Sequence, residues 1–222
     1  VQVVSWRLGE PELDGFGLRR IDDREFLCHE FEPLLASDEL GLAGRHNLAN
    51  ALAALAIGHA AGLPLAGMAE SLRRFEGLPH RCQEVAVIDG VRYVDDSKGT
   101  NIGATEAALG GLGGDRDIVL IAGGQGKGAD FAPLRRAAAR HCKAAILIGE
   151  DAPQIERALQ DAVPVVRADT LEQAVVLAAE QAQAGDCVLL SPACASFDMF
   201  SGYAERGDVF GRAVEALRGD GA

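Results

Sequence analysis

The second part of the chain alternates between short apolar runs and longer mixed stretches. Three of the runs, "DIVLIAG", "AAILIG" and "CVLLSPA", are unbroken, as expected for parallel strands that are buried on both faces. The pattern predicts six strands, at residues 83–88, 91–95, 117–122, 144–148, 164–167 and 186–190. It predicts five helices, near residues 102–112, 132–140, 152–160, 170–183 and 202–218. Strand–helix alternation of this kind indicates an α/β fold, a Rossmann-like three-layer domain with a mostly parallel sheet.

The first part of the chain has a different pattern. Residues 1 to about 40 have the character of short strands joined by turns, clearest in "VQVVSWRL" and "REFLCHEF", and we find no functional motif there. An Ala-rich segment predicts a helix from about Leu48 to Ala61. A second, shorter helix should follow Pro64, because proline is well suited to a helix start.

A break in both patterns indicates a domain boundary. The segment "FEGLPHR" carries Gly77 and Pro79, which interrupt regular structure. We therefore expect two domains, 1–77 and 78–222. The chain starts in an apparent strand with no initiator Met, so we expect a fragment of a longer protein.

Composition excludes several classes of protein. The 222 residues are 48% apolar and 24% charged, with a net charge of -12 and scattered basic residues. A nucleic-acid partner would need a basic face, so none is expected. The longest apolar stretch, "NLANALAALAIGHAAGL", is interrupted by Asn50 and His59, so we expect no membrane insertion.

The cysteines argue for a reducing compartment. The chain has five, without a CxxC pair: Cys28, Cys82, Cys142, Cys187 and Cys194. An odd number at wide spacing disfavours both a disulfide framework and a zinc site. We expect a cytoplasmic protein with no metal site in this chain.

The stretch "YVDDSKGTN", residues 93–101, places polar groups between a predicted strand and a predicted helix. Ligands bind at this edge of open α/β sheets. Lys98 can neutralise a phosphate or a carboxylate, and Asp96 can orient that lysine or hold a ribose hydroxyl. The alternative is a solvated turn with one surface salt bridge. In that interpretation four residues serve only the turn and the helix cap: Asp95, Ser97, Thr100 and Asn101.

A glycine-rich stretch, "IAGGQGKGADF" at residues 121–131, follows a central strand. Its glycines let backbone N–H groups converge on an anion, and Lys127 adds a cation. It is not a Walker A sequence, because Gly128 follows the lysine and Ile121 takes the place of the first glycine. Nor is it GxGxxG, since Ala129 replaces the third glycine. The alternative is a plain glycine-rich turn.

The last polar stretch, "LLSPACASFDMFSGYAERG" at residues 189–207, also follows a strand. Ser196 offers a hydroxyl, and three aromatic side chains can line a pocket: Phe197, Phe200 and Tyr203. Cys194 has no histidine near it in sequence, so we interpret it as a small buried residue.

Two smaller clusters precede these stretches. In "RHNLAN", Asn47 and Asn50 lie on one helix face at i, i+3, and capping explains Asn47 more readily than Asn50. In "PHR", His80 is followed by Arg81, which can reach a phosphate; such a pair is otherwise ordinary surface.

Taken in order, five stretches resemble the C-terminal half of a Mur ligase: "GRHNLANALAALA", "GLPHR", "DDSKGTN", "GGQGKGADF" and "SPACASFDMFSGYAERG". The resemblance runs from about Gly44 to Leu217. Within the family, "DDSKGTN" and "SPACAS" are most similar to the ligase that adds D-glutamate to UDP-N-acetylmuramoyl-L-alanine in peptidoglycan precursor synthesis. Sister ligases carry a D-Y-A-H or D-S-Y-N type sequence at the first of these positions.

The resemblance implies an ATP-dependent, ADP-forming ligase of three domains that acts through an acyl phosphate and requires Mg²⁺. Residues 1–77 would be the end of the central ATPase domain, and residues 78–222 the C-terminal domain that binds the incoming amino acid. The P-loop, the Mg²⁺ ligands and the nucleotide-sugar domain would lie upstream of Val1. This chain alone should therefore be inactive, and we expect a monomer with a hinge near residues 78–80.

The resemblance also implies residue roles. The ATP site would include Asn47, Asn50, Arg81, Asp96 and Lys98. The D-glutamate pocket would include Thr100, Lys127, Ser196, the Phe197 backbone and Tyr203, which stands where the family more usually has Phe. The catalytic groups would be Lys98, Lys127, His80 and Arg81.

Other functions remain open at this point. A folylpolyglutamate synthase-like ligase shares the architecture and also adds glutamate, but "DDSKGTN" argues against it. A non-catalytic Rossmann-type binding domain would suit a chain without a P-loop. A nicotinamide dehydrogenase would need a GxGxxG after a strand, which is missing.

Overall fold

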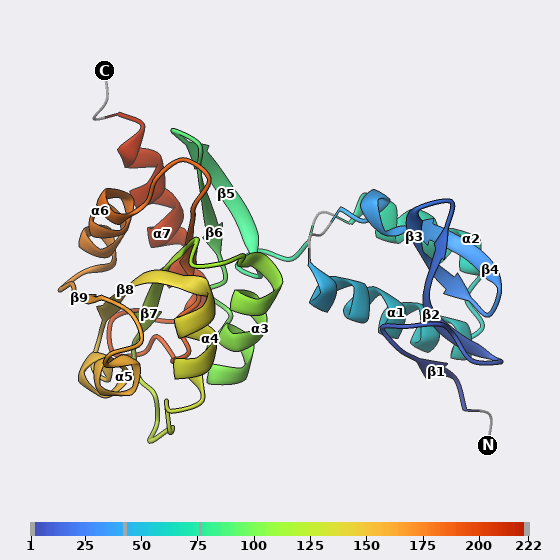
Figure 1. Cartoon of the computed structure of the whole chain (residues 1–222), viewed down its shortest axis with the longest axis horizontal. Helices are drawn as coiled ribbons and strands as arrows, with labels where there is room; N and C mark the ends of the chain where they lie inside the picture. The colour runs from blue at the N-terminus through green and yellow to red at the C-terminus, as the bar shows by residue number, and fades with distance from the viewer. Residues whose placement is uncertain (1–2, 42–43, 76, 220–222) are drawn as a thin grey trace. The chain divides into compact units, whose positions relative to one another are not determined.

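The computed structural model describes residues 3–41, 44–75 and 77–219. The chain divides into two compact units, Val1–Gly77 and Leu78–Ala222 (Figure 1), here called the first and the second unit. Each unit has a hydrophobic core of its own.

The first unit combines a small mixed sheet with two helices. The strands are β1 (Ser5–Trp6), β2 (Gly15–Ile21), β3 (Arg24–His29) and β4 (Glu32–Ala36), in that spatial order. β1 is parallel to β2, whereas the other two pairs are antiparallel. A 3₁₀ turn, Ser37–Glu39, leads to the helices α1 (Arg45–Ala60) and α2 (Leu65–Arg74). Phe16, Leu27 and Leu52 are fully buried in the core that the sheet shares with both helices.

Two sequence predictions for this unit were imprecise. "VQVVSWRL" contributes only the two-residue β1, and its first two residues lie outside the described part of the chain. α1 begins at Arg45 rather than Leu48, so Asn47 lies inside the first turn and does not cap the helix. Gly44 takes the N-cap position at φ 100°, a conformation that favours glycine.

The second unit is a three-layer α/β domain. Its sheet has the order β5-β6-β10-β7-β8-β9, with β5 antiparallel to β6 and every other pair parallel. The strands are β5 (Gln83–Ile88), β6 (Val91–Asp95), β7 (Ile118–Gly123), β8 (Cys142–Ile148), β9 (Val165–Arg167) and β10 (Cys187–Leu190). The predicted fold class is confirmed, and each predicted strand or helix of this unit lies within two residues of the observed one.

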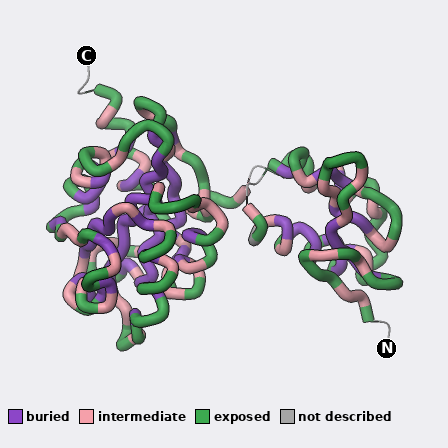
Figure 2. Tube along the Cα trace, viewed as in Figure 1, coloured by how far each residue is buried: buried purple, intermediate pink, exposed green. Residues whose placement is uncertain are grey.

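Helices cover both faces of this sheet (Figure 1). One face packs against α3 (Ile102–Leu112), α4 (Leu134–His141) and α5 (Ala152–Leu159). The other packs against α6 (Leu171–Gln181) and α7 (Tyr203–Leu217). Along β10, Leu189 enters the first core while Val188 and Leu190 enter the second, because successive side chains point to opposite faces. Figure 2 shows the result, with buried strands inside and exposed helix surfaces outside.

The position of β10 determines where the polar stretches meet. The strand is last in sequence but lies between β6 and β7 in the sheet. In a parallel sheet the carboxyl ends of neighbouring strands share one edge. The loops after β6, β10 and β7 are therefore neighbours, although they are far apart in the sequence.

Replacing Leu189 tests the importance of this central strand. Leu189→Ala should destabilise the second unit by about 2–5 kcal/mol, because it leaves a cavity in a fully buried strand. Urea unfolding followed by circular dichroism measures the loss. The single tryptophan, Trp6, lies in the first unit, so its fluorescence transition should stay in place. Val176→Ala, at a half-exposed position of α6, is the control and should change stability by about 0.5 kcal/mol or less. Equal effects of the two substitutions would contradict the prediction.

Candidate functional site

Three loops are joined by backbone hydrogen bonds at the carboxyl edge of the sheet. The loop after β10 reaches the loop after β6, since Ala193 N donates to Gly99 O at 2.9 Å. It reaches the loop after β7 through an antiparallel bridge between Gln125 and Ala195, with bonds of 2.9 and 3.0 Å. The three polar stretches identified from the sequence thus form one continuous surface.

A buried arginine ties two of these loops to α7. Arg206 is 1% exposed, and its Nε donates to Ser97 Oγ at 3.0 Å while Nη2 donates to Ser97 O at 2.8 Å. Both Nη atoms donate to Cys194 O at 3.2 Å. The Ser97 hydroxyl in turn donates to Tyr203 O at 2.7 Å. Burial lowers the pKa of Arg206 to about 10, so the side chain stays charged at neutral pH.

His80 is held by the first of the two adjacent aspartates. Its Nδ1 is hydrogen-bonded to Asp95 Oδ2 at 2.7 Å, and Asp95 Oδ1 accepts from Ser97 N at 2.8 Å. Gly207 lets α7 approach this pair closely, because a Cβ there would collide with His80 Nδ1 and Asp95 Oδ2. His80 is thus fixed at the start of the second unit, beside the candidate site.

Asp96 is buried and has a different partner from the one we expected. Its Oδ2 accepts from Ser191 Oγ at 2.7 Å, and it is only 7% exposed. No ion pair joins it to Lys98, so in this structure it does not orient that lysine. Burial raises the pKa of Asp96 to about 6, opposed by hydrogen bonds from Ser191 and Cys82.

Lys98 is placed over an aromatic ring. Its Nζ lies 4.2 Å from the centroid of the Tyr203 ring, within the range of a cation–π contact. The His80 ring meets the same tyrosine edge-on at 6.1 Å between centroids. Thr100 is half-buried next to Asn101, whose Oδ1 caps α3 as predicted by accepting from Ala104 N at 3.0 Å.

The glycine-rich loop is shaped by an aspartate in the turn between β8 and α5. Asp151 Oδ2 accepts from Gly126 N at 2.6 Å, and Asp151 N donates to Gly124 O at 3.0 Å. Lys127 adopts a positive φ of 54°, and its exposed side chain lies over Phe197, with Nζ 5.6 Å from the ring centroid. Ser196 is buried beside Phe197.

The remaining candidates have simpler environments. Cys194 is buried, as expected from the sequence, and burial raises the pKa of its thiol to about 12. Arg81 is exposed, without an ion pair to any residue that the structure describes. Asn47 and Asn50 belong to α1 of the first unit, where Asn50 Nδ2 lies 3.4 Å from Asn47 Oδ1. Those two asparagines are therefore described within the first unit by itself.

Asp95 was considered from the sequence only as a turn residue; its bond from Ser97 N fits that role, but its contact with His80 was not predicted. Three further supporting residues were missed: Asp151, Ser191 and Arg206. For one of them a signal was present. Arg206 precedes Phe210 by four residues and Val214 by eight, so the three side chains share one face of α7, and this face is buried. A charged residue on such a face indicates a buried polar network.

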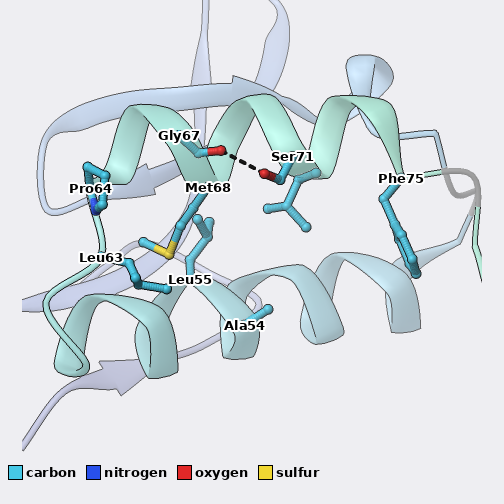
Figure 3. Close-up of a pocket in the computed structure, with 9 residues that line it drawn as sticks. Ala54, Leu55, Leu63, Pro64, Gly67, Met68, Ser71 and Phe75 are labelled. Carbon is cyan, nitrogen blue, oxygen red and sulfur yellow. Dashed lines mark hydrogen bonds between the residues drawn. The ribbon is translucent and has the colours of Figure 1, made fainter.

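The first unit contains a separate hollow that suits neither ATP nor glutamate. It lies between α1 and α2, has a volume of about 540 Å³ and is almost wholly apolar (Figure 3). Its lining is Ala54, Leu55, Leu63, Pro64, Gly67, Met68, Ser71, Leu72 and Phe75. The Ser71 hydroxyl in this lining donates to Gly67 O at 2.9 Å, so it already has a hydrogen-bond partner within α2 (Figure 3).

Neither a metal cluster nor a membrane span is found in the described part of the chain. No group of three or more His, Cys, Asp or Glu side chains among the described residues is arranged to hold a metal ion. None of the described helices is long and apolar enough to cross a membrane.

Residues 80–194, more than half of the chain, match the family model of the Mur ligase glutamate ligase domain. The chain belongs to the Mur ligase family. The matched residues contain His80, Asp96, Lys98 and Lys127, so most of the site described above lies in the part of the chain that matches the family model.

Among curated proteins, the chain is similar to UDP-N-acetylmuramoylalanine–D-glutamate ligases. It is 58% identical to the enzyme of Pseudomonas syringae pv. syringae over 215 residues, 54% to that of Pseudomonas aeruginosa and 50% to that of Nitrosococcus oceani. The match covers 96% of this chain but 48% of the first relative, in its C-terminal half. The chain thus spans about half the length of the curated relatives that it matches.

Solved structures agree with the fold. UDP-N-acetylmuramate-alanine ligase from Thermotoga maritima superposes with a TM-score of 0.65 at 16% identity, and the match covers 91% of this chain and 46% of the Thermotoga chain. A folylpolyglutamate synthase of Mycobacterium tuberculosis, complexed with ADP, gives a TM-score of 0.64 at 16% identity, covering 89% and 48%. At such identities the likeness establishes the fold alone.

Removing the buried guanidinium tests its role in the site. Arg206→Ala should lower the stability of the second unit by about 2–4 kcal/mol, because Ser97 O and Cys194 O lose charged donors inside the protein. Arg206→Lys should recover part of this loss, since lysine keeps the charge but not the fork of donors. Urea unfolding measures both. Arg212→Ala, at an exposed position on the same helix, is the matched control, and equal stability of the two alanine variants would refute the role.

The raised pKa of Asp96 predicts a pH-dependent stability. The folded state holds this proton more tightly than the unfolded state, so the stabilisation is complete below the unfolded pKa near 4 and is lost as the pH rises through about 6. Asp96→Asn removes the titration, so its stability relative to the native chain should rise by about 2 kcal/mol between pH 4 and pH 7. Urea unfolding at several pH values measures this difference. A pH-independent difference for Asp96→Asn would contradict the assignment.

Proposed function

We propose that this chain is the C-terminal part of an ATP-dependent ligase that joins D-glutamate to UDP-N-acetylmuramoyl-L-alanine. The observation that carries the proposal is 58% identity, along almost the whole chain, to a UDP-N-acetylmuramoylalanine–D-glutamate ligase. The site geometry supports it, because two lysines from separate loops stand at one sheet edge without a carboxylate partner among the described residues. We place the reaction in the cytoplasm, with the enzyme acting as a monomer.

The proposed reaction has two steps, and atoms balance in each. A carboxylate oxygen of the L-alanyl group attacks the γ-phosphorus of ATP, the bond to ADP breaks, and an acyl phosphate forms. The amine of D-glutamate then attacks the acyl carbon, phosphate leaves, and the amine gives up a proton. Both steps develop negative charge on oxygen, which fixed cations stabilise.

The residues of the second unit suit the anionic parts of this reaction. In the proposal Lys98 and Arg81 face phosphate oxygens, since Lys98 has no competing carboxylate and the Arg81 side chain is exposed. Asp96 would hold the ATP ribose. His80 would act as a partner of Arg81, positioned by Asp95 at 2.7 Å.

The amino-acid pocket is assigned to the loops after β6, β7 and β10. D-Glutamate carries two carboxylates, and Lys127 offers a charged donor to one of them. Thr100, Ser196, the Phe197 backbone and Tyr203 would complete the pocket. The bridge between Gln125 and Ala195 supports this grouping, because it joins the loops of Lys127 and Ser196 directly.

In the proposal, the other parts of the ATP site and the Mg²⁺ ligands lie outside the site of the second unit. We take residues 1–77 as the end of the central ATPase domain, with Asn47 and Asn50 toward ATP, and residues 78–222 as the C-terminal domain. The described residues do not fit a Mg²⁺ site, so no step is assigned to Mg²⁺ here. Without a P-loop, this chain alone should not turn over ATP.

A chimeric enzyme tests the function. The first half of the Pseudomonas syringae relative is joined to this chain in place of the half that it matches, and phosphate release is measured with ATP and UDP-N-acetylmuramoyl-L-alanine. Release should require D-glutamate and should not occur with L-glutamate. Lys127→Ala should lower kcat/KM for D-glutamate roughly ten- to hundred-fold, the worth of one charge-assisted hydrogen bond.

The control is Arg136→Ala, which removes a charge from the exposed surface of α4 and should leave activity unchanged. Release with L-glutamate and a folate acceptor would instead support a folylpolyglutamate synthase-like ligase. A folded chimera that releases no phosphate with any acceptor would refute the proposed function.

A further inference from the structure

The few lysines of the chain have an unusual distribution. The sequence has 21 basic Lys and Arg residues, of which only three are lysines: Lys98, Lys127 and Lys143. Lys143 forms an ordinary ion pair with Asp186 at 2.7 Å. The other two stand in the loops after β6 and β7, and each places its Nζ over an aromatic ring, at 4.2 and 5.6 Å. Both rings come from one segment, residues 197–203.

Lys98 contacts a ring although carboxylates are close to it in sequence. The Asp95 carboxylate is hydrogen-bonded to His80 Nδ1 and to Ser97 N. The Asp96 carboxylate accepts a hydrogen bond from Ser191 Oγ. The ring of Tyr203 is held in place from its backbone, since Ser97 Oγ donates to Tyr203 O at 2.7 Å. The residue before Lys98 therefore anchors the backbone of the tyrosine whose ring Lys98 covers.

Lys127 and Phe197 repeat the arrangement on the neighbouring loop. Phe197 is 64% exposed, so its ring is open to the lysine rather than packed in the core. The bridge between Gln125 and Ala195 fixes the spacing of the two loops, two residues before each member of the pair. A contact with a lysine gives this exposed phenylalanine a role.

We propose that the aromatic rings of Phe197 and Tyr203 are positioning residues that hold the ammonium groups of Lys127 and Lys98 ready for an anionic ligand. The identity of that anion rests on the proposed function: a carboxylate of D-glutamate at Lys127, and a phosphoryl or acyl-phosphate oxygen at Lys98. The rings hold each flexible side chain near its binding position, which reduces the rotamer entropy lost on binding. A ring attracts a cation without neutralising it, so the charge remains for the ligand.

Lysine NMR tests the positions of these side chains directly. With ¹³C-lysine labelling the chain gives three Cε methylene signals, and Lys143 serves as an internal reference. A methylene held against a ring face is shifted upfield. Tyr203→Phe should keep the Lys98 shift, whereas Tyr203→Leu should abolish it and leave Lys127 unchanged. Phe197→Leu should do the reverse. The Tyr203→Leu variant should still fold, because the hydrogen bond from Ser97 Oγ goes to the backbone carbonyl of Tyr203 and not to its side chain.

The matched control is Phe31→Leu in the first unit. Phe31 is 73% exposed and lies under Arg19, with the guanidinium carbon 5.4 Å from the ring centroid, so the substitution removes the same kind of contact elsewhere. It should alter no lysine signal. An unchanged Lys98 signal in Tyr203→Leu, together with an unchanged Lys127 signal in Phe197→Leu, would overturn the proposal.

Titration of the same labelled chains with D-glutamate and with inorganic phosphate tests the consequence for binding. Affinity for D-glutamate should fall roughly two- to five-fold in Phe197→Leu, the strength of an exposed cation–π contact. Phosphate affinity should fall by a similar factor in Tyr203→Leu and recover in Tyr203→Phe. Equal affinities in Tyr203→Leu and Tyr203→Phe, despite a displaced Lys98 signal, would also overturn the positioning role. If the lysine signals of the native chain respond to phosphate but not to D-glutamate, the proposed binding of D-glutamate is contradicted. The role of the rings is then still decided by the ring-current shifts of the lysine signals.

Discussion

The candidate site depends on one buried guanidinium. Arg206 has almost no contact with solvent, and taking such a charge out of water is costly. The cost is offset by donors that reach Ser97 Oγ, Ser97 O and Cys194 O, so every partner lies on one of two functional loops. These bonds fix α7, the loop after β6 and the loop after β10 as one body. The positions of Lys98, Ser196 and Tyr203 all follow from that constraint.

A second constraint is electrostatic. The chain has a net charge of -12, yet its candidate site presents two lysine ammonium groups. The nearby carboxylates accept hydrogen bonds from neutral groups of the protein rather than from these lysines. Asp96 accepts from Ser191, Asp151 from Gly126 N, and Asp198 from Glu150 N at 2.9 Å. These carboxylates keep their charge but are held by neutral donors of the loops, so none of the three forms an ion pair with Lys98 or Lys127 in the described part of the chain.

Relatives and geometry support different parts of the functional conclusion. Sequence identity of 50–58% with D-glutamate ligases bears on the substrate, whereas solved structures at 16% identity bear on the fold alone. The geometry adds the hydrogen-bond and ring contacts of each candidate residue, which neither comparison provides. Lys98 contacts Tyr203 and not Asp96, and Asp95 rather than Asp96 holds His80.

The sequence by itself determined the elements of the second unit and the stretches that carry its chemistry. Unbroken apolar runs such as "DIVLIAG" identify buried parallel strands because burial on both faces leaves no polar position, and Asn101 identified its own helix cap because capping is a local interaction. The first unit was less readable, since two-residue β1 and glycine-capped α1 depend on packing rather than on a strong local pattern.

Only the tertiary structure decided the order of the strands and the partners of the site residues. β10 inserts between β6 and β7, and periodicity does not encode which buried strands become neighbours. The contacts of Arg206 with Ser97 and of Ser191 with Asp96 join residues about one hundred positions apart. Such contacts depend on where the chain brings distant loops, because a hydrogen bond requires two groups within about 3 Å and a local sequence pattern specifies only one of them.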